Sequence, residues 1–258
     1  LPHARCFATL CMTFCPPVNL KLDICFSPEL LPLYQLEGKT AVIVDILRAT
    51  STIVTAMAAG VTQVFPVATL EECRALGQQH QCLTAAERDG IPAEGFDLGN
   101  SPFGFLDETQ PVAGRTLSIS TTNGTLALHR SRAAAAIVVG AFLNLSAVAD
   151  FARREGRDVL VVCAGWKGHF CLEDTVFAGA LAEALQADFD IRSSDAALAG
   201  LHLWQQAQPD LAAYLLQSSH VRRLNSLEAS KDFDFCLQID RYAHVLPRWQ
   251  EDRLVSGF

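Results

Sequence analysis

Short apolar runs alternate with amphipathic segments along most of the chain. Most apolar runs are followed by a turn or by polar residues, which is the pattern of a buried strand. Between the runs, apolar residues recur at the three- and four-residue spacing of a helix. We therefore expect strands over 20–26, 41–45, 61–67, 82–86, 116–120, 133–141 and 158–164.

Helix signals fall between these runs. Three hydroxyl residues at 50–52 offer N-caps to a helix over 50–59, and Thr69 with Glu72 forms a capping box that opens a helix over 69–79. Further helices are expected over 124–130, 146–154, 173–186 and 193–223, whereas 233–239 fits either a strand or a helix. Strands that alternate with helices predict the α/β class, with a parallel or mixed sheet covered on both faces.

No linker or internal repeat divides the chain, so we expect one α/β domain over 20–258. Residues 1–19 are predicted to be a poorly ordered N-terminal extension, since no cleavage site of the A-x-A kind follows their apolar stretch. The segment 90–111 is rich in Gly and Pro and is expected to be a long loop. No apolar run reaches the length of about 18 residues that predicts a membrane-spanning helix, and no membrane partner is expected.

Composition and charge narrow the classes of partner. Half of the 258 residues are hydrophobic and 19% are charged, so a folded chain is expected. The net charge of −8 disfavours nucleic acid as a partner, because phosphate backbones attract basic surfaces. A small anionic substrate is compatible with this charge, since a few local bases suffice to make an anion pocket.

The nine cysteines include no C-x-x-C pair, and most lie inside apolar segments. This distribution favours reduced, buried thiols and a cytoplasmic protein, and the spacing predicts no zinc site. The seven histidines also lack metal-ligand spacing. His169 and His220 lie near segments of interest, where we expect structural or solvent-facing side chains.

Polar side chains gather where four of the predicted strands end. Ligands of open α/β sheets bind beyond the carboxyl ends of the strands. If these four strands are parallel neighbours, their polar clusters converge at one edge of the sheet. The clusters are Asp45, Arg48, Thr50 and Ser51 at the end of 41–45; Glu87 and Arg88 after 82–86; Ser120, Thr121, Thr122 and Asn123 at the end of 116–120; and Gly165, Lys167, Glu173 and Asp174 after 158–164.

Each cluster also has a simpler structural interpretation. Asp45 and Arg48 could form a local ion pair, although an acid that ends a buried strand favours a functional role. The segment 118–125 could be only a helix start, and the same backbone N–H groups and hydroxyls would also suit an anion. Glu173 and Asp174 could be acids that favour the helix dipole, or ligands of a hard cation such as Mg²⁺.

Familiar phosphate and hydrolase motifs are absent. Gly38, Lys39 and Thr40 look like the end of a phosphate-binding loop, but Leu33 stands where that loop needs glycine, and a strand follows instead of a helix. The aspartyl-phosphate phosphatases carry a second acid two residues after the first, and Leu47 occupies that position. Neither G-x-S-x-G nor G-x-G-x-x-G occurs.

Six segments form a specific combination: VDILRATSTI (44–53), AERDG (86–90), FDLGNSP (96–102), STTNGT (120–125), CAGWKGHFCLEDTVFAGAL (163–181) and KDFDFCLQID (231–240). Any one of them would be weak evidence, whereas their order and joint presence are specific. Together they resemble the 2-phosphosulfolactate phosphatases of coenzyme M biosynthesis, and the resemblance covers about 20–247.

The resemblance implies a three-layer α/β/α fold and a Mg²⁺-dependent acid phosphatase that releases phosphate from an α-hydroxy acid bearing a sulfonate. It also implies that ten matching positions belong to the site: Asp45, Arg48, Glu87, Arg88, Asn100, Thr121, Thr122, Asn123, Glu173 and Asp174. Adjoining positions are expected to contact the substrate as well; they are Thr50, Ser51, Ser120, Gly124 and Gly165.

The residue types indicate a role for each group. A carboxylate either attacks phosphorus or deprotonates water, so Asp45 is expected to be the nucleophile or a metal ligand. Glu173 and Asp174 are expected to bind Mg²⁺ or to act as a general base. Arg48 and Arg88 would clamp the anionic groups of the substrate.

Two alternatives use the same residues: a non-catalytic anion-binding protein, and a Mg²⁺-dependent lyase or phosphotransferase. The carboxylates favour catalysis, because pure anion binding needs bases and amides. The turn at 121–123 would hold phosphate or sulfonate in each case. The apolar helical region over 201–216 fits either the core or the interface of a homo-oligomer.

Overall fold

The computed structural model describes residues 20–223 and 227–257, and the extension expected at 1–19 lies outside them. The strands are β1 (Leu20–Cys25), β2 (Thr40–Val44), β3 (Gln63–Pro66), β4 (Leu83–Arg88), β5 (Ile91–Pro92), β6 (Thr116–Ser120), β7 (Ala136–Gly140), β8 (Val159–Cys163), β9 (Phe189–Asp190), β10 (Pro247–Gln250) and β11 (Arg253–Ser256). Within the described residues these eleven strands form one sheet, in the order β5-β4-β6-β3-β11-β10-β7-β2-β8-β1-β9.

Two parallel groups of strands make up most of this sheet. β4, β6 and β3 are parallel neighbours on one side, and β7, β2, β8, β1 and β9 are parallel neighbours on the other. The hairpin of β10 and β11 lies between the groups and pairs antiparallel with β7 and β3. All five residues of β2 are buried, as a strand covered on both faces requires. The predicted mixed, mainly parallel sheet is confirmed.

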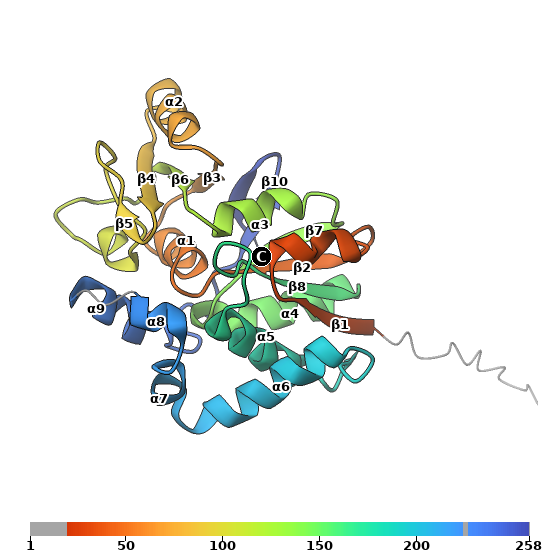
Figure 1. Cartoon of the computed structure of the whole chain (residues 1–258). Coiled ribbons are helices and arrows are strands. Elements are labelled where there is room, and N and C mark those ends of the chain that lie inside the picture. Colours follow the sequence, from red (N-terminus) through yellow and green to blue (C-terminus); the bar gives the residue numbers. More distant parts are fainter. Residues whose placement is uncertain (1–19, 224–226, 258) are drawn as a thin grey trace, which may run out of the picture.

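Helices cover both faces of the sheet. The α-helices are α1 (Ala49–Ala58), α2 (Leu70–His80), α3 (Gly124–Arg130), α4 (Leu145–Glu155), α5 (Leu172–Leu185), α6 (Asp195–Ala207), α7 (Leu211–Leu215), α8 (Ser219–Arg223) and α9 (Leu227–Cys236), and the 3-10 helices are η1 (Pro28–Leu33), η2 (Pro102–Phe105), η3 (Phe142–Asn144) and η4 (Gln208–Asp210). α4, α5 and α6 pack on one face of the β7-to-β1 group, and α3 and η1 pack on the other (Figure 1). The predicted three-layer α/β/α fold is therefore confirmed.

The apolar helix α5 is buried along most of its length because α6 packs closely against it. A Cβ atom added to Gly179 of α5 would lie 1.9 Å from the carbonyl oxygen of Gly200 in α6. Only glycine lets two helix backbones approach this closely. The contact holds α5, whose first turn carries Glu173 and Asp174, in a fixed position.

Some predicted elements differ in the structure. The helix expected over 193–223 is divided into α6, η4, α7 and α8. Pro209 in η4 lacks the N–H that a continuous helix needs, and Asp210 caps α7 by accepting a hydrogen bond from the N–H of Ala213. The ambiguous segment 233–239 is helical at its start, since α9 ends at Cys236. The sequence pattern predicted neither β9 nor the hairpin of β10 and β11.

Two other local predictions need correction, and one is confirmed. The loop expected over 90–111 includes β5 and η2. The hydroxyl residues at 50–52 lie inside α1 and do not cap it, because α1 begins earlier and its N-cap is Arg48, without a side-chain hydrogen bond. The capping box of Thr69 and Glu72 is confirmed at the start of α2.

Burial agrees with two further expectations. The cysteines of the described residues are free and buried; they are Cys25, Cys73, Cys82, Cys163, Cys171 and Cys236. In the apolar region 201–216, Leu201 and Leu215 belong to the core, whereas Leu216 is exposed. Within the described part of the chain, no helix combines the length and the apolar character needed to cross a membrane.

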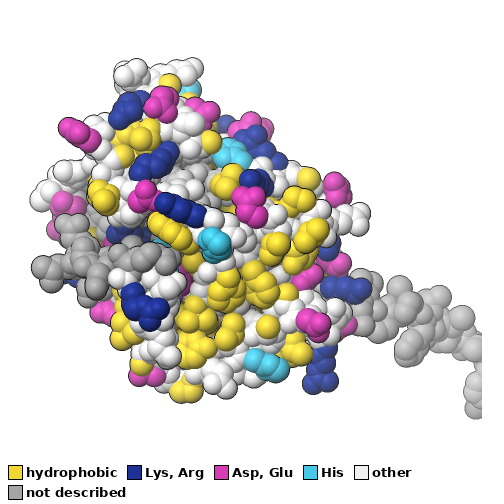
Figure 2. Space-filling model, in the orientation of Figure 1, with side chains coloured by type: hydrophobic (Ala, Val, Ile, Leu, Met, Phe, Trp, Pro, Cys, Tyr) yellow, Lys and Arg dark blue, Asp and Glu magenta, His cyan; other side chains and the backbone are white. Residues whose placement is uncertain are grey.

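Apolar side chains also gather on the surface. Figure 2 shows a patch of them below the centre of one face, over the region where Figure 1 labels α5. Leu33 of η1 is 80% exposed, and Phe170, just before α5, is 50% exposed. The expected homo-oligomer stays a prediction.

The path of the chain reverses direction at the carboxyl end of β2. After β2 the chain crosses through α1 to β3 in the other half of the sheet, and it returns at β7. After β7 it passes through α4 to β8, on the opposite side of β2. Open α/β sheets bind ligands beyond the strand ends where the chain reverses direction in this way.

Candidate active site

Strand β2 ends in a turn that hydroxyl groups hold in place. The Thr50 hydroxyl accepts a hydrogen bond from the N–H of Asp45 at 3.0 Å and donates to the carbonyl oxygen of Asp45 at 2.9 Å. The Ser51 hydroxyl donates to the carbonyl oxygen of Ile46 at 2.9 Å. These two predicted site residues therefore fix the backbone that carries Asp45, whose side chain is buried at this edge of the sheet.

The start of α3 lies against Asp45. A Cβ atom added to Gly124 would lie 2.9 Å from Oδ2 of Asp45, 2.7 Å from Cβ of Ala49 and 3.4 Å from Oγ1 of Thr121. Because glycine has no Cβ, the segment after β6 can approach the end of β2 this closely. The contact brings together two predicted site segments whose strands are not neighbours.

The four strands that end in the polar clusters form two neighbouring pairs. β4 lies beside β6 and β2 lies beside β8, but β3, β11, β10 and β7 separate the pairs. The polar clusters still meet, because Gly124 contacts Asp45 and Arg48 reaches the backbone at Gly90. The expected convergence therefore arises from the segments after the strands as well as from the strand order.

The guanidinium group of Arg48 is buried, and protein groups bind both of its terminal nitrogens. One terminal nitrogen pairs with the carboxylate of Asp232 in α9, and the other donates to the carbonyl oxygen of Gly90 at 3.1 Å. The Ser101 hydroxyl also donates to Asp232, at 2.6 Å. Among the described residues, Nε of Arg48 has no hydrogen-bond partner. Arg48 thus connects α1, α9 and the segment at 90–101.

Glu87 and Arg88 end β4 and contact the segment after its neighbour β6. The Thr122 hydroxyl donates to Oε1 of Glu87 at 2.5 Å, and Arg88 donates to the Ser120 hydroxyl at 2.9 Å. Arg88 also donates to the backbone carbonyl oxygens of Glu87 and Ser120, at 2.6 Å and 3.3 Å. Glu87 is buried, whereas Arg88 is half-buried and retains contact with solvent.

Lys167 joins the loop after β8 to the ends of β4 and β6. Its Nζ lies 2.7 Å from Oδ1 of Asp89, and its N–H donates to Oδ1 of Asn123 at 3.1 Å. The N–H of Asp89 in turn donates to the Thr122 hydroxyl at 3.3 Å. Lys167 and Asp89 are exposed, so this group forms the outer rim of the site.

The carboxylate of Asp174 ties the turn after β2 to the loop after β8. Its Oδ1 accepts the N–H of Ile46 at 2.9 Å, and its Oδ2 accepts the N–H of Gly165 at 3.1 Å. Gly165 has a φ of 62°, and a Cβ there would lie 2.3 Å from a carbonyl oxygen of the same loop. Burial, followed by the charges of Glu173 and Asp45, raises the pKa of Asp174 well above its usual value.

Glu173 has different partners from the adjacent Asp174. Its Oε2 accepts a hydrogen bond from the Ser218 hydroxyl at 3.0 Å, and its Oε1 forms a close hydrogen-bonded pair with Nδ1 of His220. Burial alone would raise the pKa of Glu173, but the hydrogen bonds from His220 and Ser218 and the charge of His220 outweigh burial. The pKa of Glu173 therefore lies below its usual value.

The buried acids oppose one another's ionisation. Burial raises the pKa of Asp45 to about 6; His220 opposes this rise, and the charges of Glu87 and Glu173 add to it. A divalent cation relieves such repulsion, and Mg²⁺ prefers oxygen ligands. Each carboxylate oxygen also keeps a lone pair beyond the hydrogen bonds described. The donor chemistry of Asp45, Glu173 and Asp174 therefore fits Mg²⁺.

The three predicted metal ligands do not form a closed cage. In the described part of the chain, one group of three acidic, histidine or cysteine residues brings all its ligand atoms within 4.8 Å of one another, and it consists of Cys171, Glu173 and His220. Mg²⁺ does not require an all-protein cage, because it usually keeps several waters and binds one or two carboxylates together with substrate phosphate.

Asn100 is buried, and within the described residues its Oδ1 has no hydrogen-bond partner. A buried acceptor without a donor is costly, so this oxygen suits a hydroxyl or another donor of a ligand. The next residue, Ser101, binds Asp232. The segment at 100–101 therefore borders the ion pair of Arg48.

Sequence reasoning missed Asp232 and His220 as members of this cluster. Asp232 binds Arg48 from 184 residues away in the sequence, and His220 binds Glu173 from 47 residues away. The local sequence does not single out Asp232, because the segment 231–240 also contains Asp234 and Asp240. His220 was expected to be structural or solvent-facing, and it is buried.

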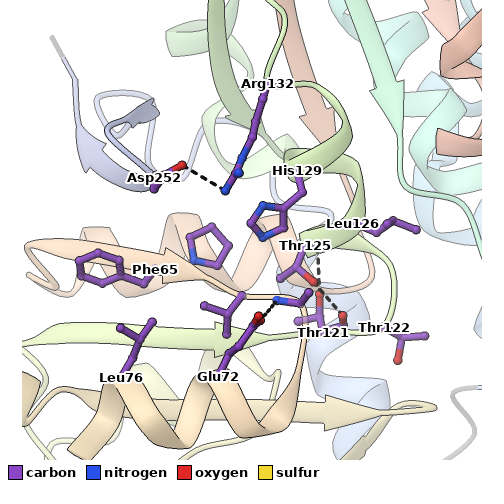
Figure 3. A pocket seen from close by; sticks show the side chains of 13 residues that line it. Phe65, Glu72, Leu76, Thr121, Thr122, Thr125, Leu126, His129, Arg132 and Asp252 are labelled. Atoms are coloured by element: carbon purple, nitrogen blue, oxygen red, sulfur yellow. Dashed lines mark hydrogen bonds and ion pairs between the residues drawn. The ribbon is translucent and has the colours of Figure 1, made fainter. Parts of the chain in front are cut away.

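A separate hollow lies beside the turn at 121–122 (Figure 3). It has a volume of about 680 Å³, and most of its lining surface is apolar. Arg132 is the one Lys or Arg among its described lining residues, and it pairs with Asp252 at 3.1 Å. Because Arg132 already pairs with Asp252, this hollow is poorly suited to a phosphate, and the polar cluster at Asp45 is the better candidate site.

Comparison with known proteins gives a consistent result. A family model described as 2-phosphosulpholactate phosphatase matches residues 25–252. A probable 2-phosphosulfolactate phosphatase of Caldanaerobacter subterraneus subsp. tengcongensis is 38% identical over 216 residues, which cover 83% of this chain and 88% of that protein. A protein of the same description from Synechococcus is 39% identical over 238 residues, which cover 90% and 97%. Another from Thermotoga maritima is 39% identical over 215 residues, covering 83% and 91%.

Proposed function

Because the chain belongs to the 2-phosphosulpholactate phosphatase family, we propose that it hydrolyses 2-phosphosulfolactate, or a closely similar phosphorylated hydroxy acid, with Mg²⁺ as its cofactor. Water replaces the hydroxy acid on phosphorus, so the products are inorganic phosphate and the free hydroxy acid, sulfolactate for the first substrate. Family membership supports the reaction class, which is hydrolysis of a phosphoric monoester.

One observation carries the proposal, the gathering of buried carboxylates beside arginine side chains at the end of β2. The acids are Asp45, Glu87, Glu173 and Asp174. A protein that only binds anions needs bases and amide donors, and buried acids would repel its ligand. Phosphoryl transfer, in contrast, uses carboxylates as a nucleophile, a base or the ligands of a cation. The acids therefore favour the hydrolase over the binding protein.

We assign the central catalytic role to Asp45. The N–H of Ala49, at 3.4 Å, is the one donor to its carboxylate among the described hydrogen bonds, whereas Glu173 and Asp174 each hold two partners. As a nucleophile, Asp45 would form a bond to phosphorus while the bond to the substrate oxygen breaks and that oxygen takes a proton. As a base, it would take a proton from the attacking water.

The two arginines have different roles in this proposal. Arg48 is neutralised by Asp232, so it positions the backbone around Asp45. Arg88 is half-buried and donates to neutral oxygens of Glu87 and Ser120, with no ion pair among the described residues. Its charge is therefore available to a phosphate or sulfonate group.

Oxygens of Asp45, with those of Asp174 or Glu173, would hold Mg²⁺ next to the substrate. The ion supplies positive charge that neutralises phosphoryl oxygens. Asp174 also keeps the N–H groups of Ile46 and Gly165 in place, which fixes the turn that carries Asp45.

Phosphate release from 2-phosphosulfolactate tests the proposal. We expect release by the wild-type protein with Mg²⁺, loss of release after chelation, and recovery when Mg²⁺ is added back. Asp45→Asn should abolish release, whereas Asp195→Asn, an exposed acid in the first turn of α6, should not change it. The stereochemical course at phosphorus would distinguish the two routes, because an aspartyl phosphate requires two displacements and gives retention, whereas direct attack by water gives inversion.

Other outcomes would favour the alternatives. Release that persists in Asp45→Asn would keep the phosphatase and remove Asp45 from its centre. A product that retains phosphate would indicate a lyase or phosphotransferase. Binding without turnover across a panel of phosphorylated hydroxy acids would indicate an anion-binding protein.

A further inference from the structure

Three potential metal ligands from two distant parts of the chain meet beside the phosphatase site, to which one of them, Glu173, also belongs. Sγ of Cys171, a carboxylate oxygen of Glu173 and a ring nitrogen of His220 all lie within 4.8 Å of one another, and all three residues are buried. Cys171 is the N-cap of α5, Glu173 lies in its first turn, and His220 lies in α8. The sequence pattern does not predict this group, because His220 is 47 residues from Glu173.

The donor atoms differ in kind from those around Asp45. A thiolate, an imidazole and a carboxylate together form a set that Zn²⁺ and similar ions prefer. Mg²⁺ prefers oxygen donors alone. The two neighbouring sets of ligands therefore select different ions, although they share Glu173.

The spacing of the three atoms suits a small tetrahedral site. Bonds to Zn²⁺ of about 2.0 to 2.3 Å place tetrahedral ligand atoms roughly 3.3 to 3.7 Å apart. Side-chain movements of about 1 Å would bring atoms from a 4.8 Å separation into this range. The close pair of Glu173 and His220 would open by a similar amount to admit the ion.

Neighbouring groups hold two of the ligands in orientation. The Ser218 hydroxyl donates a hydrogen bond to Oε2 of Glu173 at 3.0 Å and accepts one from the backbone N–H of His220 at 3.1 Å. The Trp166 ring lies over the His220 ring, with 5.3 Å between their centroids. Such supporting contacts fix the direction of metal ligands and strengthen binding.

We propose that Cys171, Glu173 and His220 bind a thiophilic divalent cation of the Zn²⁺ class. Binding releases the thiol proton of Cys171 and the proton that Glu173 shares with His220, and no atom changes its oxidation state. The bound ion takes the Glu173 carboxylate away from the phosphatase site and so inhibits phosphate release. This consequence for catalysis rests on the proposed function, whereas the metal site does not.

Cobalt spectroscopy and zinc competition test the site directly. All proteins carry the changes C6S, C11S and C15S, so that the remaining thiols are those of the described residues. We expect Co²⁺ to give a sulfur-to-cobalt charge-transfer band, which is lost in Cys171→Ser. Against a chromophoric chelator, Cys171→Ser and His220→Ala should each bind Zn²⁺ at least about 100-fold more weakly, beyond what a supporting residue costs.

Cys73→Ser is the matched control, because Cys73 is a buried thiol that donates to Ser118 and Ala85 in the other half of the sheet. It should keep both the band and the affinity. Far-ultraviolet circular dichroism establishes that each variant is folded, and a variant that does not fold is replaced by the conservative change Cys171→Ala or His220→Asn. Unchanged zinc affinity in folded Cys171 and His220 variants would overturn the proposal.

Phosphate release separates the two proposals. With Mg²⁺ constant, Zn²⁺ should inhibit the starting protein, and Cys171→Ser should need at least about 100-fold more Zn²⁺ for the same inhibition. Zinc binding through Cys171 without any phosphate release would leave the metal site and overturn the function. Normal phosphate release without zinc binding would overturn the metal site alone.

Discussion

Replacing Asp232 tests whether its buried pair with Arg48 holds the site together. The two side chains are 1% and 7% exposed, so water screens neither charge. Removing one partner of such a pair leaves the other charge uncompensated and costs about 3 to 5 kcal/mol. Asp232→Asn keeps the size of the side chain and removes its charge, and we expect the free energy of unfolding to fall by about 3 kcal/mol.

Thermal unfolding followed by circular dichroism gives the magnitude. A loss of 1 kcal/mol lowers the melting temperature of a domain of this size by about 2 to 4 °C, so Asp232→Asn should melt about 6 to 12 °C lower. Asp234→Asn is the matched control, because Asp234 is an exposed acid in the same helix α9. Its effect should stay within about 0.5 kcal/mol, as for most surface changes.

A double-mutant cycle isolates the contribution of the charge pair. Arg48→Met combined with Asp232→Leu removes both charges and keeps apolar bulk, so the double variant should lose less stability than the sum of the losses in Arg48→Met and Asp232→Leu. Phosphate release should fall in each of these variants, because the backbone around Asp45 loses a support. An Asp232→Asn protein that melts within about 2 °C of the wild type would refute the reasoning.

Three further predictions follow from close contacts. Gly124→Ala places a Cβ 2.9 Å from Oδ2 of Asp45, so unfolding free energy should fall by about 1 to 3 kcal/mol and phosphate release should fall as well. Gly179→Ala forces α5 away from Gly200, so chemical denaturation should detect a loss of about 3 kcal/mol or more. Asp174→Asn leaves one backbone N–H without an acceptor, so stability should fall by about 1 to 3 kcal/mol and Mg²⁺-dependent turnover should fall too.

Controls and contrary results differ among these three variants. Gly104→Ala suits the glycine changes, because its Cβ would meet only the end of the Leu98 side chain at 3.4 Å. Full activity in Gly124→Ala would show that the segment after β6 need not touch Asp45. An unchanged melting curve for Gly179→Ala would contradict the close packing of α5 and α6. If Asp174→Asn matches the wild type in both stability and turnover, the positioning role of Asp174 is contradicted.

The sequence predicted those parts of the fold that depend on local pattern. The strand over 116–120 has the predicted bounds, because turn residues lie on both sides of it. The hairpin of β10 and β11 was missed because each strand is four residues long and mixes charged with apolar residues. Such short strands gain their stability from pairing with β7 and β3, which local pattern does not report.

Within the candidate site, the sequence predicted the residues that lie at or just after the end of a strand. Asp45 was found because an acid that ends an apolar run is unusual at a buried position. Asp232 and His220 lie in helical segments and meet their partners through tertiary packing. The hydroxyls of Thr50 and Ser51 were noticed, but the sequence did not show that they bind the backbone of their own turn. Family membership confirms the predicted reaction class, and the roles of single residues stay predictions.

The hairpin of β10 and β11 also affects how a newly made chain reaches its final state. Residues 247–256 leave the ribosome after the remaining strands of the described residues, yet they supply the pairing partners of one side of β3 and one side of β7. Until they emerge, both half-sheets present an open edge to which another chain can add. The hairpin therefore closes both edges, and the nascent protein stays vulnerable to aggregation until the hairpin docks.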